Sequence, residues 1–179
     1  MGLSMSGRPV GRWLFGKLPA LGDFLSRGLD FDLRDAIDHW LSTEMEMAKA
    51  RFGAGFDSRY FTAPAWCFVD CDPAGQWCGG ALCASVDAAG RQFPIMAGAP
   101  ANDVDEAVAL AGGMLELLYG ALAQGWSADR LQSAPLAPAG LPWQPTAAGW
   151  AVIGEGGPPV LLPGRFPQRI VECMVELAA

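Results

Sequence analysis

The sequence predicts an α+β fold in which a central antiparallel sheet is flanked by helices. Two segments, 32–52 and 102–124, repeat apolar residues at helical spacing, and three short runs between them are typical of strands. With 179 residues, 51% of them hydrophobic, the chain is long enough to bury a continuous core without metals or disulfides. We therefore expect a single domain over residues 1–179.

Capping and turn residues set the order of the elements. Asp30 or Asp32 can cap the first long helix, and Gly53 ends it. Two turn sequences that begin at Asp72 and Asp87 separate three strands, which indicates an antiparallel meander. The expected elements are a strand at 13–15, a helix at 32–52, a helical turn at 56–62, strands at 65–71, 78–86 and 92–98, a helix at 102–124, a strand at 149–154 and a terminal helix from Pro167 to Ala178.

The second long helix carries two apolar stripes and opens with the capping box Asp103 and Glu106. One interpretation buries it between the sheet and another helix. In the other interpretation, the second apolar stripe contacts a partner protein. A membrane span is disfavoured, because Glu116 lies in the middle of the segment and the apolar run is short for a bilayer.

Residues 133–149 contain four prolines among alanines and glycines. This composition predicts an extended connection that crosses the surface inside the domain, anchored by Trp143 and Trp150. Earlier in the chain, Gly79-Gly80 marks a bulge or a close backbone approach within a strand.

Charge and cysteine content exclude several classes of function. The net charge of −7 and the pI near 4.6 disfavour nucleic-acid binding. The odd number of cysteines and the absence of paired C-x-x-C spacing indicate reduced thiols and no zinc site. The amino terminus has no apolar segment typical of a secretory signal. We expect a cytoplasmic protein without a cofactor or a bound metal, and without direct membrane insertion.

Catalysis would have to use the only histidine, His39, which lies on the polar side of the first long helix. Cys67 or Cys83 could pair with it, but both lie in expected buried strands, where the pKa of a thiol rises and its reactivity falls. We therefore expect a protein that is not an enzyme. A small-molecule-binding or cysteine-dependent hydrolytic domain is the alternative, and a deep pocket with converging polar groups would favour it.

The chain is organised around the segment 15–24, which contains two glycines and a proline. Gly16 or Gly22 can adopt positive φ, and Pro19 fixes its own φ, so the sequence predicts a rigid turn that joins the first strand to the first helix. Lys17 follows the first glycine and not the second, so the segment is not a phosphate-binding P-loop. Its apolar residues are expected to reach the core while Lys17 and Asp23 stay exposed to water.

Three blocks of residues carry a resemblance to a known family. The first is Phe15-Gly16-Lys17-Leu18-Pro19 with Gly22-Asp23-Phe24 and Arg27-Gly28-Leu29. The second is Thr62-Ala63-Pro64 with Trp66 and Phe68, and the third is Ser85-Val86-Asp87 with Gly90-Arg91 and Phe93-Pro94. In this order, over residues 13–100, they resemble the TagF/ImpM family of accessory proteins of bacterial type VI secretion.

The resemblance implies a function and a set of partners. Family members act after translation as negative regulators of type VI secretion assembly, in relation to a threonine-phosphorylation pathway and its forkhead-associated scaffold protein. It also suggests a layered fold similar to longin-type domains, and a homodimer is left open. The signature residues to which a protein-binding role is assigned on this basis are Gly16, Lys17, Pro19, Gly22, Asp23, Phe24, Arg27, Trp66, Asp87, Gly90, Arg91 and Pro94.

Overall fold

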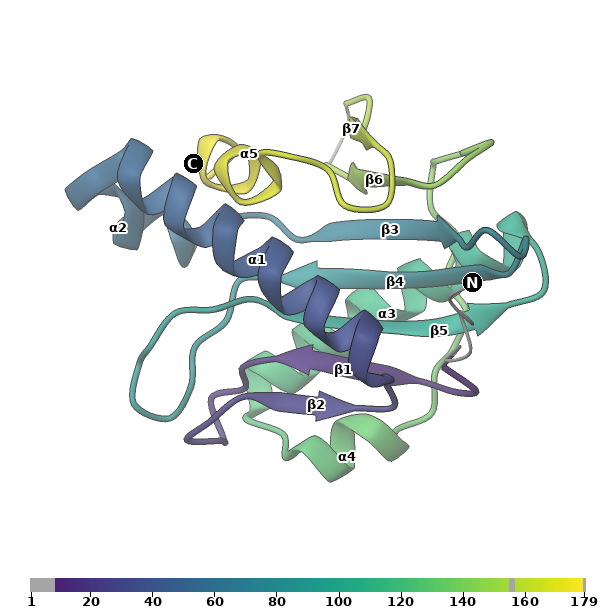
Figure 1. Ribbon diagram of the computed structural model, residues 1–179, viewed down its shortest axis with the longest axis horizontal. Helices are drawn as coiled ribbons and strands as arrows, with labels where there is room; N and C mark the ends of the chain where they lie inside the picture. The colour runs from purple at the N-terminus through teal and green to yellow at the C-terminus, as the bar shows by residue number, and fades with distance from the viewer. Residues whose placement is uncertain (1–8, 155–156, 179) are drawn as a thin grey trace, which may run out of the picture.

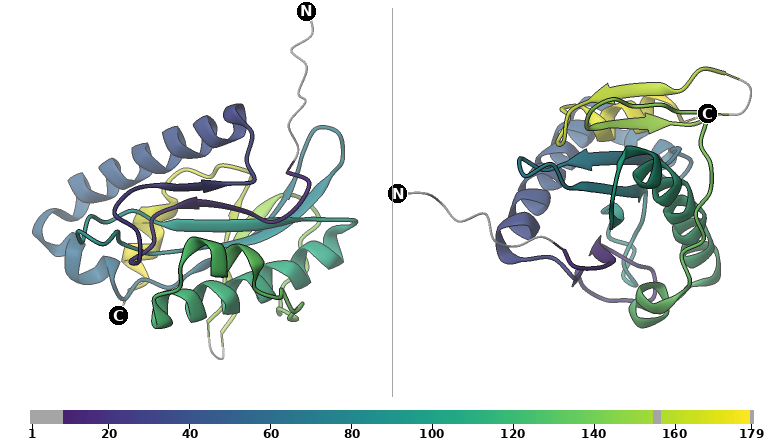
Figure 2. Two further views of the ribbon diagram at one scale, coloured as in Figure 1. Left: turned by 90° about the horizontal axis from the view of Figure 1, so that it is seen from below. Right: turned by 90° about the vertical axis from the view of Figure 1, so that its right-hand side faces the viewer.

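A computed structural model describes residues 9–154 and 157–178. One antiparallel sheet of seven strands lies between two helical layers, in the order β2-β1-β5-β4-β3-β6-β7 (Figures 1 and 2). The expected α+β class, with an antiparallel sheet flanked by helices, is confirmed. The elements are β1 (Trp13–Gly16), β2 (Leu25–Arg27), α1 (Phe31–Phe52), a 3-10 turn (Gly53–Gly55), α2 (Phe56–Tyr60), β3 (Trp66–Cys71), β4 (Trp77–Cys83), β5 (Ile95–Ala101), α3 (Val104–Gln124), α4 (Ala128–Ser133), β6 (Gly149–Val152), β7 (Val160–Pro163) and α5 (Ile170–Glu176).

Besides the 3-10 turn, three short elements of the described chain were not predicted. β2 has three residues, β7 has four and α4 has six, so none is long enough to show a clear period in the sequence. β5 begins at Ile95, three residues later than expected, because before it the chain makes only an isolated bridge between Val86 and Gln92. We expected no secretory signal from the sequence of residues 1–8, and these residues lie outside the described part of the chain.

α1 and α5 cover one face of the sheet, and the core beneath them is aromatic. Phe68 and Trp150 pack with their ring centroids 4.7 Å apart. Glycines on β4 and β5 provide the space for these large rings. A Cβ atom at Gly80 would lie 2.4 Å from the Phe68 ring, and one at Gly98 would lie 2.6 Å from the Trp13 ring. The small residues of the central strands therefore fit the large residues of their neighbours.

α3 covers the opposite face and packs against β3, β4 and β5. It approaches β4 closely, because a Cβ atom at Gly79 would lie 1.9 Å from the Ala107 carbonyl oxygen. β4 pairs with β3 and β5 without interruption. Of the two interpretations of Gly79-Gly80, the close backbone approach is therefore correct and the bulge is wrong.

The extended connection at 134–141 covers the side of α3 that faces away from the sheet. The amide of Ala139 donates a hydrogen bond of 2.9 Å to the Ala109 carbonyl. Cβ atoms at Gly112 and Gly113 would lie 2.2 and 2.1 Å from the carbonyl oxygens of Ala139 and Ala137. The chain's own irregular segment thus lies where the sequence suggested another helix or a partner protein.

By length and composition alone, α3 could cross a bilayer, and it is the one described helix that could. It is also the helix that the connection and three strands cover, as is usual for the core helix of a folded domain. Its capping box forms as expected, with the Asp103 carboxylate accepting from the Glu106 amide at 2.8 Å and the Glu106 carboxylate accepting from the Asn102 amide at 2.6 Å.

The two outer strands of the sheet are protected in different ways. Arg27 on β2 forms an ion pair of 3.2 Å with Asp129 on α4. At β7, the Gly164 amide donates a hydrogen bond to the Ala148 carbonyl. In an antiparallel pair, every second residue bonds to the partner strand, so the backbone groups of residues 161 and 163 point toward the open edge instead. Pro163 has no N–H to offer there, which makes β7 a poor template for a further strand.

Candidate functional site

The signature segment connects β1 to β2, and the expectation that it joins the first strand directly to the first helix is wrong. Gly16 ends β1 with φ 128°, so it is the glycine that uses positive φ. A Cβ atom at this position would lie 1.9 Å from the Pro94 carbonyl oxygen, because the loop crosses the start of β5 in close contact. The next residue, Lys17, donates its amide to the same carbonyl at 3.3 Å.

Three side chains form an ion-pair cluster where this loop meets the turn after β4; we call Lys17, Asp87 and Arg91 the signature cluster. The ammonium Nζ of Lys17 lies 3.0 Å from Oδ2 of Asp87, and Nε of Arg91 lies 2.7 Å from the same oxygen. The other oxygen, Oδ1, accepts hydrogen bonds from the amides of Ala89 at 3.0 Å and Arg91 at 2.9 Å. The carboxylate is fully buried and every one of its close neighbours is a donor.

Lys17 is buried, so the expectation that it stays exposed to water is wrong. It is 6% exposed, because its ammonium group reaches inward to Asp87 and also lies 5.0 Å from the centre of the Phe24 ring. Asp23 is exposed as expected, and its carboxylate accepts from the Phe24 amide at 2.7 Å.

Hydrogen bonds hold the signature loop against the turn at 85–94. The Arg91 guanidinium donates to the Gly22 carbonyl at 2.8 Å, and the Ala88 amide donates to the Leu21 carbonyl at 2.7 Å. Ser85 donates its hydroxyl to the Lys17 carbonyl at 2.7 Å. The two loops therefore form a single tightly connected unit.

Phe24 and Arg91 are the two large side chains of this unit that face solvent. Phe24 is 48% exposed and packs edge-on against the buried Phe93, with ring centroids 4.8 Å apart. The side chain of Arg91 is 62% exposed, although its Nε contacts buried Asp87. An aromatic ring and a guanidinium group are thus exposed on the same pair of connected loops, each in contact with the signature cluster.

The structure brings only part of the signature together. Gly16, Gly22, Phe24 and Pro94 join the signature cluster through the contacts above, and Gly90 adopts φ 80° in the same turn. Two residues lie apart. Trp66 is fully buried on β3, and Arg27 forms its ion pair with α4. Pro19 is partly exposed within the loop.

The depressed pKa of Asp87 makes a testable prediction about acid stability. Burial alone would raise the pKa of Asp87, but the Arg91 and Ala89 amides and the Lys17 and Arg91 side chains outweigh burial and hold it well below its usual value. A carboxylate whose pKa is lower in the folded state stabilises the fold above its unfolded pKa of about 4, and this contribution is lost as the pH falls further. The difference in melting temperature between the native protein and Asp87→Asn should therefore be large at pH 6 and shrink toward pH 3, as measured by circular dichroism. A constant difference would contradict this assignment.

The possible catalytic pairs of the sequence do not form. Cys67 and Cys83 are buried on the face of the sheet that α3 covers, whereas His39 is exposed on α1, on the opposite face. Burial raises the pKa of Cys67 to about 12 and raises the pKa of Cys83 further. Thiols in this state are poor nucleophiles.

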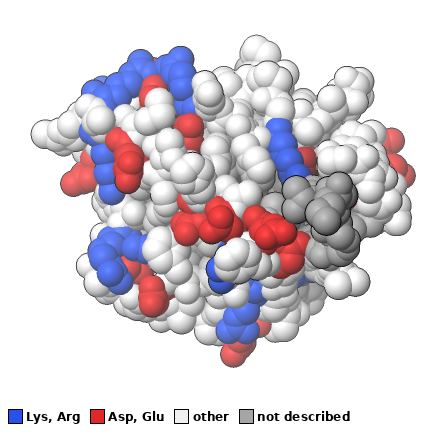
Figure 3. Space-filling model, in the orientation of Figure 1, with Lys and Arg blue, Asp and Glu red and all other residues white. Residues whose placement is uncertain are grey.

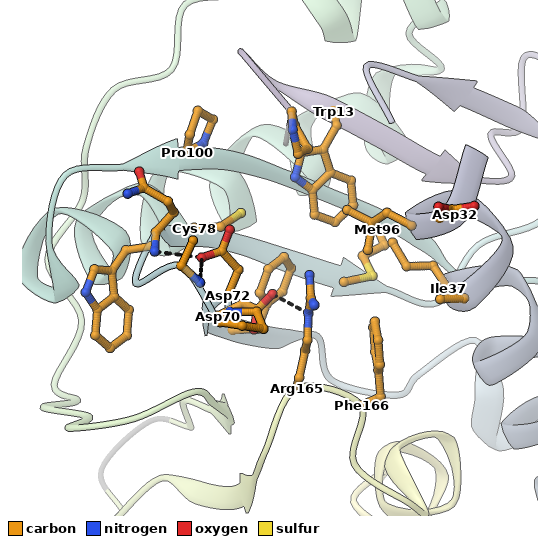
Figure 4. A pocket seen from close by; sticks show the side chains of 18 of the residues that line it. Trp13, Asp32, Ile37, Asp70, Asp72, Cys78, Met96, Pro100, Arg165 and Phe166 are labelled. Atoms are coloured by element: carbon orange, nitrogen blue, oxygen red, sulfur yellow. Dashed lines mark hydrogen bonds and ion pairs between the residues drawn. The ribbon is translucent and has the colours of Figure 1, made fainter. Parts of the chain in front are cut away.

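The structure also contains a cavity of about 570 Å³ that sequence reasoning missed. It lies between the amino-terminal half of α1, the β3–β4 turn and the segment at 165–166 (Figure 4). The signature loop does not line it. Its aromatic lining and its charged residues come from segments far apart in the sequence, so no local motif could have indicated it.

Comparisons with known proteins agree with the fold and define the family. A crystal structure of PA0076 from Pseudomonas aeruginosa PAO1 is similar to this chain with a TM-score of 0.57 and 24% sequence identity, over 93% of this chain and 78% of that one. At this identity the likeness shows a shared fold. No curated protein matches the sequence. The sequence profile of the TagF N-terminal domain, described as type VI secretion system-associated, matches residues 13–134, and the chain therefore belongs to this family.

Proposed function

We propose that the protein is a negative regulator of bacterial type VI secretion system assembly that acts after translation by binding another protein and performs no catalysis. Membership of the TagF N-terminal domain family supports the connection to type VI secretion. The regulatory direction and the forkhead-associated scaffold protein as partner follow from the resemblance described above. The proposed site of action is the cytoplasm.

One observation carries the protein-binding part of the proposal: a buried charged cluster supports an exposed aromatic and arginine pair. A buried ion pair contributes little net stability compared with apolar residues of the same volume, because both charges lose their hydration. Lys17 and Asp87 are therefore better explained by the geometry that they impose. They fix Phe24 and Arg91 at the surface, and aromatic residues and arginine are both enriched in protein interfaces.

A fixed pair of this kind is suited to protein recognition. Rigid contact residues lose little conformational entropy when the partner binds, so more of the contact energy appears as affinity. The Phe24 ring offers apolar area, and the guanidinium of Arg91 can donate to carboxylate or phosphate oxygens of the partner. We call Phe24 and Arg91 the signature pair.

The absence of catalysis is supported by the placement of the nucleophiles. His39 and the two buried thiols lie on opposite faces of the sheet, and the exposed residues that the structure describes around the signature pair include no histidine or cysteine. A separate observation, the cavity of Figure 4, favours small-molecule binding without catalysis as a second function.

The binding experiment compares matched phenylalanines and arginines. Phe24→Ala and Arg91→Ala should each weaken binding to the forkhead-associated protein of the same secretion system by about tenfold, as expected for interface residues of these types. Phe31 and Arg34 provide the control pair, because Phe31 is 67% exposed with the Arg34 guanidinium 4.9 Å from its ring centre. They lie on the first turn of α1, at the other end of β2 from the signature loop.

Affinity is measured by biolayer interferometry on purified proteins with unchanged circular dichroism spectra. Phe31→Ala and Arg34→Ala should change affinity by less than about twofold, since exposed residues outside an interface contribute little. In the host, the two signature-pair variants should raise secretion of a type VI effector when they replace the native protein. Equal affinity of all four variants would refute the proposed surface, and absence of any binding by the native protein would refute the proposed partner.

A further inference from the structure

We propose that the cavity beside the amino-terminal half of α1 binds a small organic cation, in which an amine or guanidinium group is carried on an aromatic or aliphatic body. This site is distinct from the signature loop and does not depend on the proposed regulatory function. Its volume of about 570 Å³ is within the range of small-molecule sites, roughly 300–1,000 Å³. β1, α1, the β3–β4 hairpin, β5, β6 and the segment before α5 all contribute to it.

Most of the cavity wall is aromatic or aliphatic. Trp13, Ile37, Phe68, Met96, Trp150 and Phe166 provide it. Such a wall removes apolar ligand surface from water, and aromatic faces also attract cations. The body of the ligand would therefore pack against these rings.

The wall is fixed by contacts outside the cavity. Trp40 on α1 packs 5.2 Å from Phe166 and 5.4 Å from Trp150, between ring centroids, and donates its indole N–H to the Pro167 carbonyl at 3.0 Å. The Trp150 indole donates to the Arg165 carbonyl at 3.1 Å. These bonds hold the segment at 165–167 against α1 and β6, so the cavity exists before any ligand arrives.

Charge at the cavity favours a cation. Among the described residues that line it, Asp32, Asp70 and Asp72 are acidic and Arg165 is the one basic residue, which leaves an excess of two negative charges in this part of the lining. Acidic side chains also gather near the middle of the surrounding face, over α1 (Figure 3). An anionic ligand of the same shape would meet net repulsion, and a neutral one would gain no ion-pair attraction from these carboxylates.

Asp70 is the group best placed to accept from the ligand. Its Oδ2 lies 2.7 Å from Nε of Arg165, as the dashed line in Figure 4 shows. Its Oδ1 is buried and accepts no hydrogen bond of ordinary geometry from the described residues, although the Cys71 backbone also interacts with the carboxylate and lowers its pKa. A buried carboxylate oxygen without a donor is costly, and a ligand N–H group would satisfy it.

The other carboxylates have different roles. Oδ1 of Asp72 already accepts from the amides of Ala74 at 2.9 Å and Gln76 at 2.8 Å, which shapes the β3–β4 turn. Asp32 is exposed in the first turn of α1, where it adds negative charge at the rim. Burial raises the pKa of Asp70 despite the opposing effect of Arg165, which is consistent with a carboxylate that lacks enough donors.

Three probes of similar size and different charge test the proposal: 4-phenylbutylamine, 4-phenylbutanol and 4-phenylbutyrate, each titrated at low salt by isothermal calorimetry and tryptophan fluorescence. The amine should bind at least about tenfold more tightly than the alcohol and the carboxylate, because only the amine is positively charged and can form an ion pair with Asp70. Equal binding of the three probes would overturn the proposal. So would no binding of the amine at 10 mM, because a dissociation constant of about 10 mM is the weakest that such a contact would give.

Variants locate the binding site. Asp70→Asn should weaken amine binding about tenfold and leave alcohol binding unchanged, because it removes the charge and retains the shape. Asp57→Asn, on the exposed surface of α2 and outside the cavity lining, is the control and should change neither. If Asp70→Asn does not fold, Asp32→Asn serves instead and should weaken the amine selectively by about twofold to threefold, as expected for a rim charge. Equal loss in the Asp57 variant would overturn the assignment to this cavity.

Discussion

Gly16→Ala is expected to lower the melting temperature by more than about 10 °C or to prevent folding, a larger effect than for most single substitutions. Two independent costs act at this position. Gly16 has φ 128°, which a residue with a Cβ atom rarely adopts. The new Cβ would also lie 1.9 Å from the Pro94 carbonyl oxygen and 2.9 Å from the Ile95 Cα. Both neighbours are backbone atoms of the paired strand, so they cannot move without breaking the β1–β5 ladder.

Gly22→Ala is the matched control for this prediction. Gly22 lies in the same loop, but its φ is not positive and nothing lies within 4 Å of the position that a Cβ would take. We expect its melting temperature to stay within about 3 °C of the native value, because no strain or clash is introduced. Thermal unfolding followed by circular dichroism compares the two. Similar melting temperatures for both variants would show that the loop can move away from Pro94.

These two glycines illustrate how far the sequence could predict the signature loop. The positions of glycine and proline showed that a specific turn was needed, and they limited positive φ to Gly16 or Gly22. They could not decide between the two, because the reason for Gly16 is the Pro94 carbonyl, nearly eighty residues later in the chain. Local residues therefore predicted the constraint, and the tertiary contact determined where it acts.

The same limit explains why Lys17 was expected at the surface. A lone lysine in a polar loop is exposed in most proteins. Its burial depends on Asp87, which the sequence indicated as a turn residue and as a residue of the family signature, but not as the partner of Lys17. Both roles are real, because one oxygen of Asp87 forms the turn and the other forms the ion pair. A short pattern can show the first role but not the second.

The cavity could not be predicted for a related reason. The two long helices were predicted to within two residues at every end, because their caps and their apolar spacing are local properties. A cavity instead depends on the space that the side chains of several elements leave unfilled between them. Asp70 and Arg165 have no sequence relation that would indicate their contact.

Asp87→Asn is expected to lower the melting temperature by about 10 °C at pH 7, because removing one partner of a buried ion pair leaves the other charge buried without compensation. The Lys17 side chain is only 8% exposed in the native structure, and in this variant its ammonium group loses the carboxylate that neutralises it. Asparagine can still accept from the Ala89 and Arg91 amides through its carbonyl oxygen, so the turn itself is retained. The loss therefore reports on charge and not on the shape of the turn.

The double variant Lys17→Met/Asp87→Asn separates this explanation from simple loss of contacts. If the buried charge of Lys17 without its carboxylate partner causes the loss of stability, removing that charge should restore part of the stability. The double variant should then melt about 3–5 °C higher than Asp87→Asn alone. Lys17→Met alone should cost less than Asp87→Asn, because Arg91 and two amides still compensate the carboxylate. Denaturant unfolding of all four proteins completes the cycle. Additive losses would mean that Lys17 and Asp87 stabilise the fold independently, and the surface position of Phe24 and Arg91 would then need another cause.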